Sequence, residues 1–483
     1  VTGDLNLTEF GGYLSLTGGT TIAGDVAINN YSELYLEQAH TFSNQTVTLG
    51  ETGGVSSGTL YVSPGGGMNV DNTATVNLKS GNLYLQSALV NNGTILADEA
   101  ASASIYDSGG GTIANTGTAT STNGANLSIN SANTTNTGMM SATLGSTLDL
   151  GGTWSNVGGT LAVDDTSTLN LGGSFNTTDF GTVSVTPGGI VNITGNQNNA
   201  GSTFVGAAGW KLNGGTITGG SLDGTSLPVV GGTLTGVAVT GDLNLTEFGG
   251  YLSLTGGTTI AGDVAINNYS ELYLEQAHTF SNQTVTLGEA GGVSTGAVYA
   301  TADGNDLRFA SDSILDGNGT LTSYTDPVYL DGVISPGFSA GSIQFGGDSE
   351  FILGSTAMLN IELGGVNSGE FDTITANKLT LGGGLNVSLI NGFTLADGME
   401  FDFLFVNDPL SGTGMFSGLN DMDRVATFGG FDLNIAYNVG DGNDVRLFST
   451  VSAIPEPSSI MVLTLGSIAG LGYRKRRQTR AQV

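Results

Sequence analysis

Cysteine is absent from the sequence, which excludes disulfide bonds, thiol catalysis and cysteine-bound zinc. Positive charge is scarce, because 11 lysine and arginine residues stand against 42 aspartates and glutamates, for a net charge of −31. Five of the basic residues lie at positions 474–480, so only six serve the rest of the chain. A field of this sign repels phosphate backbones, and we expect no nucleic-acid binding. Such acidity is typical of a soluble surface, with weak, distributed Ca²⁺ binding as the alternative.

Histidine and proline are also rare. The two histidines, His40 and His278, occupy the same place in two copies of one segment, so they sample one environment twice. They therefore form no constellation for a metal site or a Ser-His-Asp triad. Only 8 prolines are present, which leaves strand ladders largely uninterrupted. No stretch before residue 458 keeps the apolar spacing of an amphipathic helix, so helices should be scarce.

Glycine, by contrast, is abundant, with 80 of 483 residues, and the sequence repeats itself. Residues 1–51 recur without a change as residues 239–289, at an offset of 238. A compact globular core could not readily absorb a second copy of part of itself. A solenoid can, because each of its turns contacts only the neighbouring turns. The duplication therefore favours a stackable architecture.

A shorter period of 21 or 22 residues separates apolar–polar–apolar triplets that end in glycine or threonine–glycine, at residues 148–152, 169–173 and 191–195. This alternation is typical of short strands with one buried face, and glycine allows the sharp turns between them. A period near 20 suits one turn of a β-helix. We predict an all-β fold: a right-handed parallel β-helix, or β-solenoid, with a short C-terminal hydrophobic helix. Stacked asparagine and threonine side chains should form hydrogen bonds from turn to turn.

The chain divides into four predicted segments: solenoid repeats at 1–230, the second copy of the N-terminal repeat at 231–330, a β-rich segment at 331–450 and a tail at 451–483. Within these, residues 148–222 resemble the repetitive regions of autotransporter-like and PEP-CTERM surface proteins. Residues 334–450 resemble the C-terminal β-helix segment that precedes the sorting tail in such proteins.

The tail has three parts in a fixed order. Pro455, Glu456 and Pro457 come first, and an uncharged run at 458–473 follows directly. Its apolar and aromatic residues are Ile460, Met461, Val462, Leu463, Leu465, Ile468, Leu471 and Tyr473. A basic cluster of Arg474, Lys475, Arg476 and Arg477 closes the pattern. An uncharged run beside a basic cluster indicates a short membrane helix with a cytoplasmic C-terminus, although 16 residues are slightly fewer than the roughly 17–25 usually needed.

This order resembles the PEP-CTERM sorting signal, a tail that is also found on some ice-binding proteins. The resemblance implies that an exosortase recognises residues 455–457, with the hydrophobic helix as a membrane stop and the basic cluster as an orientation signal. It further implies export, transient anchoring in the membrane and a final place at the cell surface or in a biofilm matrix. Exopolysaccharide or surface glycans would be its partners.

The beginning of the sequence is unlike that of a complete precursor. No positively charged, apolar secretory signal precedes the repeats, and Val1 corresponds to the interior residue Val239. We therefore expect the sequence to be a fragment that lacks its export signal.

Two Asp-Gly-Asn-Asp motifs occur, at 303–306 and 441–444. Carboxylates and carbonyls in a tight loop suit calcium, which makes Asp441, Asn443 and Asp444 weak candidate ligands. The alternative is a hairpin turn in which asparagine and glycine adopt positive φ. We favour the turn and expect no cofactor.

Enzymatic activity is not expected. The adjacent acidic pairs, Asp98-Glu99 and Asp164-Asp165, would point to opposite faces of a strand, and supporting basic residues are few. A polysaccharide-degrading β-helix enzyme is thus only a remote alternative.

The predicted function is that of an extended structural or adhesive rod. The alternative is an ice-, glycan- or calcium-binding surface module. Ice binding would need threonine in regular register, and four Thr-X-Thr triplets, which start at residues 46, 116, 216 and 373, follow no turn period.

Overall fold

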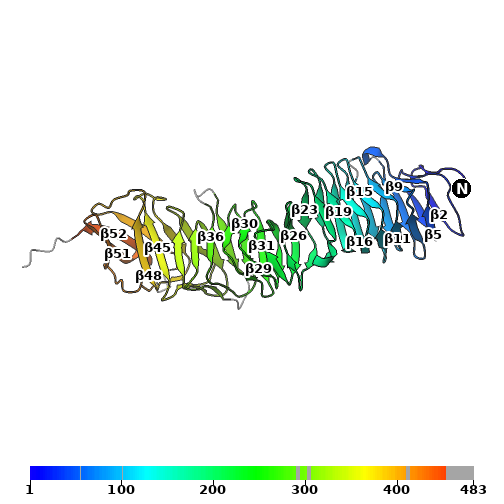
Figure 1. Ribbon diagram of the computed structural model, residues 1–483. Coiled ribbons are helices and arrows are strands. Elements are labelled where there is room, and N and C mark those ends of the chain that lie inside the picture. Colours follow the sequence, from blue (N-terminus) through cyan, green and yellow to red (C-terminus); the bar gives the residue numbers. More distant parts are fainter. Residues whose placement is uncertain (55, 100–101, 290–293, 302–305, 409–413, 453–483) are drawn as a thin grey trace, which may run out of the picture.

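The chain winds into a long rod of about 17 β-solenoid turns (Figure 1). The computed structural model describes residues 1–54, 56–99, 102–289, 294–301, 306–408 and 414–452. Within these ranges the only helical elements are two single 3₁₀ turns, Thr52–Gly54 and Thr177–Asp179. The predicted all-β solenoid is therefore confirmed. The predicted C-terminal helix lies outside the described residues, and no described helix is long and apolar enough to cross a membrane.

Strict alternation along each strand builds the core. In β4 (Ser32–Leu36) and β7 (Gly58–Val62) every second residue is buried. The two strands pair in parallel, so that Leu34 lies directly against Leu60. Apolar side chains thus stack on apolar side chains from turn to turn, and one continuous core runs along the rod.

One sheet of 27 strands runs the length of the rod, from β2 (Tyr13–Leu16) to β52 (Asp444–Val451). The sheets that form the other walls of the solenoid differ between its N-terminal and C-terminal parts. A nine-stranded sheet extends from β1 (Leu5–Leu7) to β22 (Thr182–Val185), and a seven-stranded sheet starts at β30 (Leu243–Leu245).

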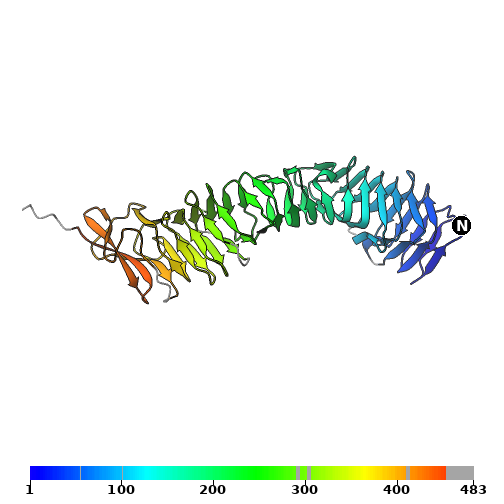
Figure 2. The same ribbon diagram turned by 90° about the horizontal axis from the view of Figure 1, so that it is seen from below.

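A four-stranded sheet, from β25 (Thr203–Phe204) to β32 (Thr259–Ile260), overlaps the change of wall. The rod changes direction in this stretch, between β23 (Ile190–Ile193) and β26 (Trp210–Thr218) (Figures 1 and 2). The division of the chain at residues 230 and 330 stays a prediction.

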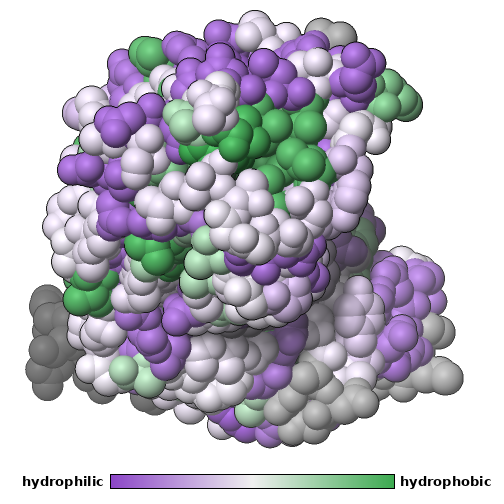
Figure 3. Space-filling view, turned by 90° about the vertical axis from the view of Figure 1, so that its right-hand side faces the viewer, coloured by the Kyte–Doolittle hydropathy of each residue, from purple (hydrophilic) through white to green (hydrophobic). Residues whose placement is uncertain are grey.

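The two identical segments fold alike. Leu5 of β1 pairs with Val26 of β3 (Val26–Ile28), and the equivalent Leu243 of β30 pairs with Val264 of β33 (Val264–Ile266). They differ in packing, because the first segment forms the end of the rod. Leucines there stay partly exposed where their counterparts are buried, and Figure 3 shows apolar surface at this end.

The other end of the described chain is closed by an antiparallel cap. β49 (Glu400–Val406) is the last strand to continue the parallel stack. β50 (Arg424–Phe428), β51 (Phe431–Val439) and β52 then run antiparallel beside it. A change of strand direction of this kind ends the repeat and covers the last turn of a solenoid.

Candidate functional site

The residues with the strongest predicted role lie outside the described part of the chain. These are the Pro455–Glu456–Pro457 motif, the hydrophobic run and the basic cluster at 474–477. The described chain reaches residue 452, just after β52. Arg446 of β52 is held by the carboxylate of Asp402, with Nη2 3.0 Å from Oδ2, and it also pairs with Glu400. The sorting residues therefore follow a strand that is fastened into the cap.

The Asp441–Asp444 motif forms the turn between β51 and β52. Val439 and Asp444 are opposite partners of the antiparallel pair, which confirms the hairpin interpretation. Asp444 Oδ1 accepts a hydrogen bond from the Val406 amide at 3.0 Å, and burial raises the pKa of Asp444. Asn443 is 2% exposed, with neither amide atom bonded among the described residues.

The assignment of Asp441, Asn443 and Asp444 as weak calcium ligands stays a prediction. Across the described ranges, no three histidine or acidic side chains come close enough together to hold a metal ion. The first Asp-Gly-Asn-Asp motif is described only at Asp306, since residues 303–305 lie outside the described ranges.

The adjacent acidic pairs serve the turns that contain them. Glu99 forms an ion pair with Lys79 at 2.8 Å, and hydrogen bonding from that lysine lowers the pKa of Glu99. Asp98 accepts a hydrogen bond from Asn123 Nδ2 at 2.6 Å. Asp164 Oδ2 accepts the backbone N–H of Leu144, also at 2.6 Å. Carboxylates engaged in this way fix loops between turns.

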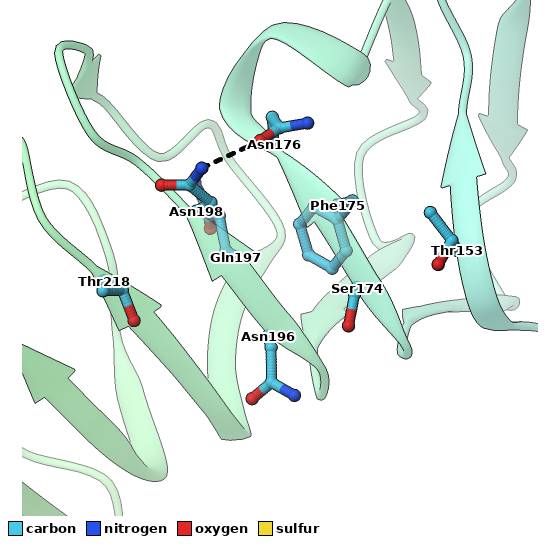
Figure 4. Close-up of a pocket in the computed structure, with 8 residues that line it drawn as sticks. All are labelled: Thr153, Ser174, Phe175, Asn176, Asn196, Gln197, Asn198 and Thr218. Atoms are coloured by element: carbon cyan, nitrogen blue, oxygen red, sulfur yellow. Dashed lines mark hydrogen bonds between the residues drawn. The ribbon is translucent and has the colours of Figure 1, made fainter.

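An uncharged depression of about 370 Å³ lies on the long sheet near the change of direction. Four strands line it: β18 (Thr147–Ser155), β21 (Ser174–Asn176), β24 (Asn196–Asn198) and β26. Its lining residues are Thr153, Ser174, Phe175, Asn176, Asn196, Gln197, Asn198 and Thr218 (Figure 4). Asn198 Nδ2 donates to Asn176 Oδ1 at 3.0 Å. The depression offers amides and hydroxyls but no ionisable group.

A column of threonines runs along the nine-stranded sheet. The same register position holds a threonine in six of seven consecutive turns, and Met139 occupies it in the other one. The threonines are Thr46, Thr75, Thr94, Thr118, Thr160 and Thr182. At about 4.8 Å per strand the column is about 29 Å long.

Complete Thr-X-Thr triplets in the sequence do not reveal this column. The neighbouring outward position holds Thr48 and Thr120 in two turns but Asn77 and Leu96 in two others. The intervals between column members also vary from 19 to 42 residues, since loops of different length join the strands. Only the strand register aligns them.

The tail matches a known sorting signal. Residues 453–477 match the PEP-CTERM protein-sorting motif. The chain carries a PEP-CTERM sorting signal. This signal implies an exported protein that is anchored in the membrane by its C-terminus and is then recognised and processed by an exosortase. No curated protein matched the sequence.

The PEP-CTERM match covers the three tail parts that the sequence analysis singled out. It includes Pro455, Glu456 and Pro457, the hydrophobic run and Arg474 to Arg477. The match concerns the sorting of the protein and its recognition by an exosortase, and it identifies no other partner.

Proposed function

We propose that this exported protein is a non-enzymatic rod with a structural or adhesive role at the cell surface or in the extracellular matrix. This proposal is supported by the presence, in one chain, of a continuous solenoid core and a C-terminal PEP-CTERM signal. A solenoid is stiff and long because each turn packs only on its neighbours. Attached at one end, it would hold its outer faces far from the membrane.

The acidic groups support a non-enzymatic role. Glycoside hydrolysis uses two carboxyl groups about 5–10 Å apart that face one substrate. Asp98, Glu99 and Asp164 are instead engaged by turn residues and by Lys79. Exopolysaccharide or other surface glycans are the partners that we propose for the rod.

The sorting step is tested by expressing the chain in an exosortase-bearing host and in the same host without the exosortase. Mass spectrometry of the C-terminus should find a new end near Pro455 only in the first host. Replacing Pro455 and Pro457 by Ala should leave the tail in place, whereas Pro187→Ala, at an exposed turn of the solenoid, should not affect processing. An intact tail on the parent protein in the exosortase-bearing host would contradict the proposal.

The role after sorting needs a separate test. Cells that lack this protein should form a less cohesive matrix or adhere less well, and the parent gene should restore the parental behaviour. A catalytic role would appear instead as release of reducing sugar from exopolysaccharide by the purified protein. Parental cohesion and adhesion in its absence, or such hydrolysis, would overturn the structural role.

The threonine column favours a second candidate, binding to ice or another crystalline surface. A flat row of hydroxyl and methyl groups at a constant interval can match a surface that repeats at a similar interval. Thr94→Lys with Thr118→Lys would break the row near its middle. Thr168→Lys with Thr320→Lys, at similarly half-buried outward positions on the long sheet, is the matched control.

Thermal hysteresis and inhibition of ice recrystallisation are the measurements for this candidate. Ice binding predicts activity in the parent and in the control, and its loss in the column variant. An inactive parent protein, or a column variant as active as the control, would rule this candidate out.

A further inference from the structure

Two exposed aromatic pairs lie at equivalent corners of the duplicated segments. The rings of Phe10 and Tyr31 meet edge to face at 5.5 Å, and those of Phe248 and Tyr269 do so at 5.6 Å. Phe10 is 82% exposed and Phe248 is 81% exposed. Phe248 lies in the middle of the rod, with turns on both sides, so its exposure does not result from the end of the stack. A phenylalanine this exposed contributes little to the core, and exposed apolar groups mark contact sites when they cluster.

The backbone holds each pair in a fixed and strained position. Tyr31 has φ of 60° and Tyr269 has φ of 61°, a left-handed conformation that bulky residues rarely adopt. The Tyr31 amide donates to the Ser57 carbonyl at 2.7 Å, and the Tyr269 amide donates to the Thr295 carbonyl at 2.8 Å. Strain of this kind persists where the surrounding structure fixes it, and it concentrates at functional sites. The pairs are thus preorganised.

A tyrosine ladder begins beside each pair on the long sheet. The rings of Tyr35 and Tyr61 stack at 4.4 Å, and those of Tyr273 and Tyr299 stack at 5.1 Å. The Tyr35 hydroxyl donates to the Glu33 carboxylate at 2.8 Å, and Tyr273 and Glu271 form the same bond at 2.6 Å. Each corner therefore combines an exposed aromatic face with hydroxyl and carboxylate groups.

The two corners belong to one sheet. Eleven strand-to-strand steps separate β2 from β31 (Tyr251–Thr255), which follow Phe10 and Phe248. At about 4.8 Å per step, the corners lie about 53 Å apart along the stack. A ligand that contacts both corners must therefore be extended, because a compact ligand could reach only one.

We propose that the two corners bind a single, uncharged polysaccharide chain, an inference that rests on the adhesive role proposed above. Aromatic faces contact the apolar faces of sugar rings, and the nearby carboxylates accept hydrogen bonds from sugar hydroxyls. Glu9 and Glu33 make the first corner negative, and Glu271 does so at the second, where Glu247 is paired with Lys211 at 3.1 Å. These charges repel anionic polymers and anionic membranes.

A protein partner fits the same surfaces less well. Stable protein interfaces bury roughly 1,200–2,000 Å² in one patch, and they surround their aromatic anchors with further contacts. Here each corner presents one edge-to-face pair of rings, and the two pairs are far apart. A repeating polymer meets such a surface with the same unit at each corner.

Affinity electrophoresis tests this proposal with dextran, laminarin, galactomannan and xyloglucan as neutral probes and with alginate as the anionic probe. The variants are Phe10→Ala, Phe248→Ala and the double replacement. The control replaces Val157 and Val205, exposed apolar residues away from the corners, by Ala. Thermal midpoints should agree across the set, because every replaced side chain is exposed.

We expect at least one neutral polysaccharide to retard the parent and the control, with no retardation by alginate. Each single variant should bind about 10-fold to 100-fold more weakly, since linked sites gain affinity from their effective concentration, and the double variant should not bind. The proposal is overturned by retardation in alginate alone, by a double variant that still binds, or by no retardation in any neutral polymer. Self-association that disappears in the double variant would replace it with a second copy of the chain as the occupant.

The double variant also separates this proposal from the broader function. In the exosortase-bearing host it should be cleaved near Pro455 like the parent, because the corners are remote from the tail in sequence. Normal cleavage with lost glycan binding supports both proposals. Normal cleavage, normal matrix cohesion and unchanged glycan binding would overturn the corner proposal and leave the structural role standing.

Discussion

Buried amides show how single residues hold the solenoid together. Four asparagines stack inside the turns as a ladder: Asn91, Asn115, Asn136 and Asn156. Each of the first three donates through Nδ2 to the Oδ1 of the next, and Asn156 donates to the Phe180 carbonyl. Each amide satisfies its neighbour, so a polar row can lie inside an apolar stack.

We predict that Asn115→Ala destabilises its part of the rod by about 2–4 kcal/mol. The replacement removes two 2.6 Å bonds of a side chain that is 1% exposed, and it leaves a buried acceptor on Asn136 without its donor. Asn92→Ala, which removes two exposed bonds, to Asn69 and from Thr116, should change stability by less than about 0.5 kcal/mol. The checks are hydrogen exchange in the neighbouring turns and the thermal midpoint. Equal effects of the two variants would contradict the ladder's role.

The buried histidines predict a dependence of stability on pH. Burial lowers the pKa of His278 to about 4 and also lowers the pKa of His40. The folded state therefore holds both rings neutral, while the unfolded chain binds protons near pH 6.5. Their contribution to the free energy of unfolding is complete above about pH 6.5 and is lost as pH falls toward about 4. For His278 this loss amounts to up to about 3 kcal/mol.

The measurement is the thermal midpoint of the parent and of the His40→Gln/His278→Gln variant at pH 7.5 and pH 4.5. The parent should lose more stability than the variant between the two values. The buried Asp372 has the opposite effect on the pH dependence of stability. Burial raises the pKa of Asp372 to about 7, so its contribution to the free energy of unfolding falls as pH rises toward 7. The difference between parent and variant isolates the histidines, because Asp372 is common to both. Identical losses would mean that the two rings are not held neutral.

At the scale of single elements, close packing of neighbouring backbones limits which residues a strand accepts. Gly58 of β7 has an ordinary φ, yet an added Cβ would overlap the carbonyl oxygen of Ile28. A Cβ added at Gly296, the counterpart of Gly58 in the second copy, would likewise overlap the carbonyl oxygen of Ile266. Gly67 in β8 (Gly67–Val70) also has an ordinary φ. The atom nearest to an added Cβ there would be the Ala88 carbonyl oxygen, 3.8 Å away.

We expect Gly58→Ala to lower the free energy of unfolding by about 1–3 kcal/mol, because β7 must move away from the preceding turn. Gly67→Ala should be neutral or slightly stabilising, since the same change of residue finds space there and reduces the entropy of the unfolded chain. Thermal unfolding of the two variants beside the parent provides the comparison. A Gly58 variant as stable as the Gly67 variant would show that the turns can separate at little cost.

Strand identity was largely predictable at this scale, because alternation has a period of two residues and is visible locally. The antiparallel pairing of the cap strands was not predictable, although their alternation of apolar and polar residues is also visible in the sequence. The direction in which a strand pairs depends on where the chain returns after a loop, and residues 409–423 carry no alternation that settles it.

At the scale of the whole molecule, independent turns imply that one complete turn can be removed. Deletion of residues 148–168 removes 21 residues and brings Leu169 to the place of Leu148, its partner in the parallel pair. We predict a folded rod whose thermal midpoint lies close to that of the parent. Deletion of residues 148–159 removes about half a turn and brings the outward Thr160 to the place of the buried Leu148, so inward side chains shift outward and the midpoint should fall strongly. Circular dichroism melting compares the two, and similar melting would contradict a stack held by register.

The sequence by itself determined the alternation of buried and exposed residues, the repeat, the scarcity of helices and the sorting signal, because each is a local pattern of a few residues. The tertiary structure alone decided which residues of distant turns stand side by side. Loops of unequal length join the strands, so the threonine column, the change of wall and the exposure of Phe248 follow from strand register and from no spacing along the chain.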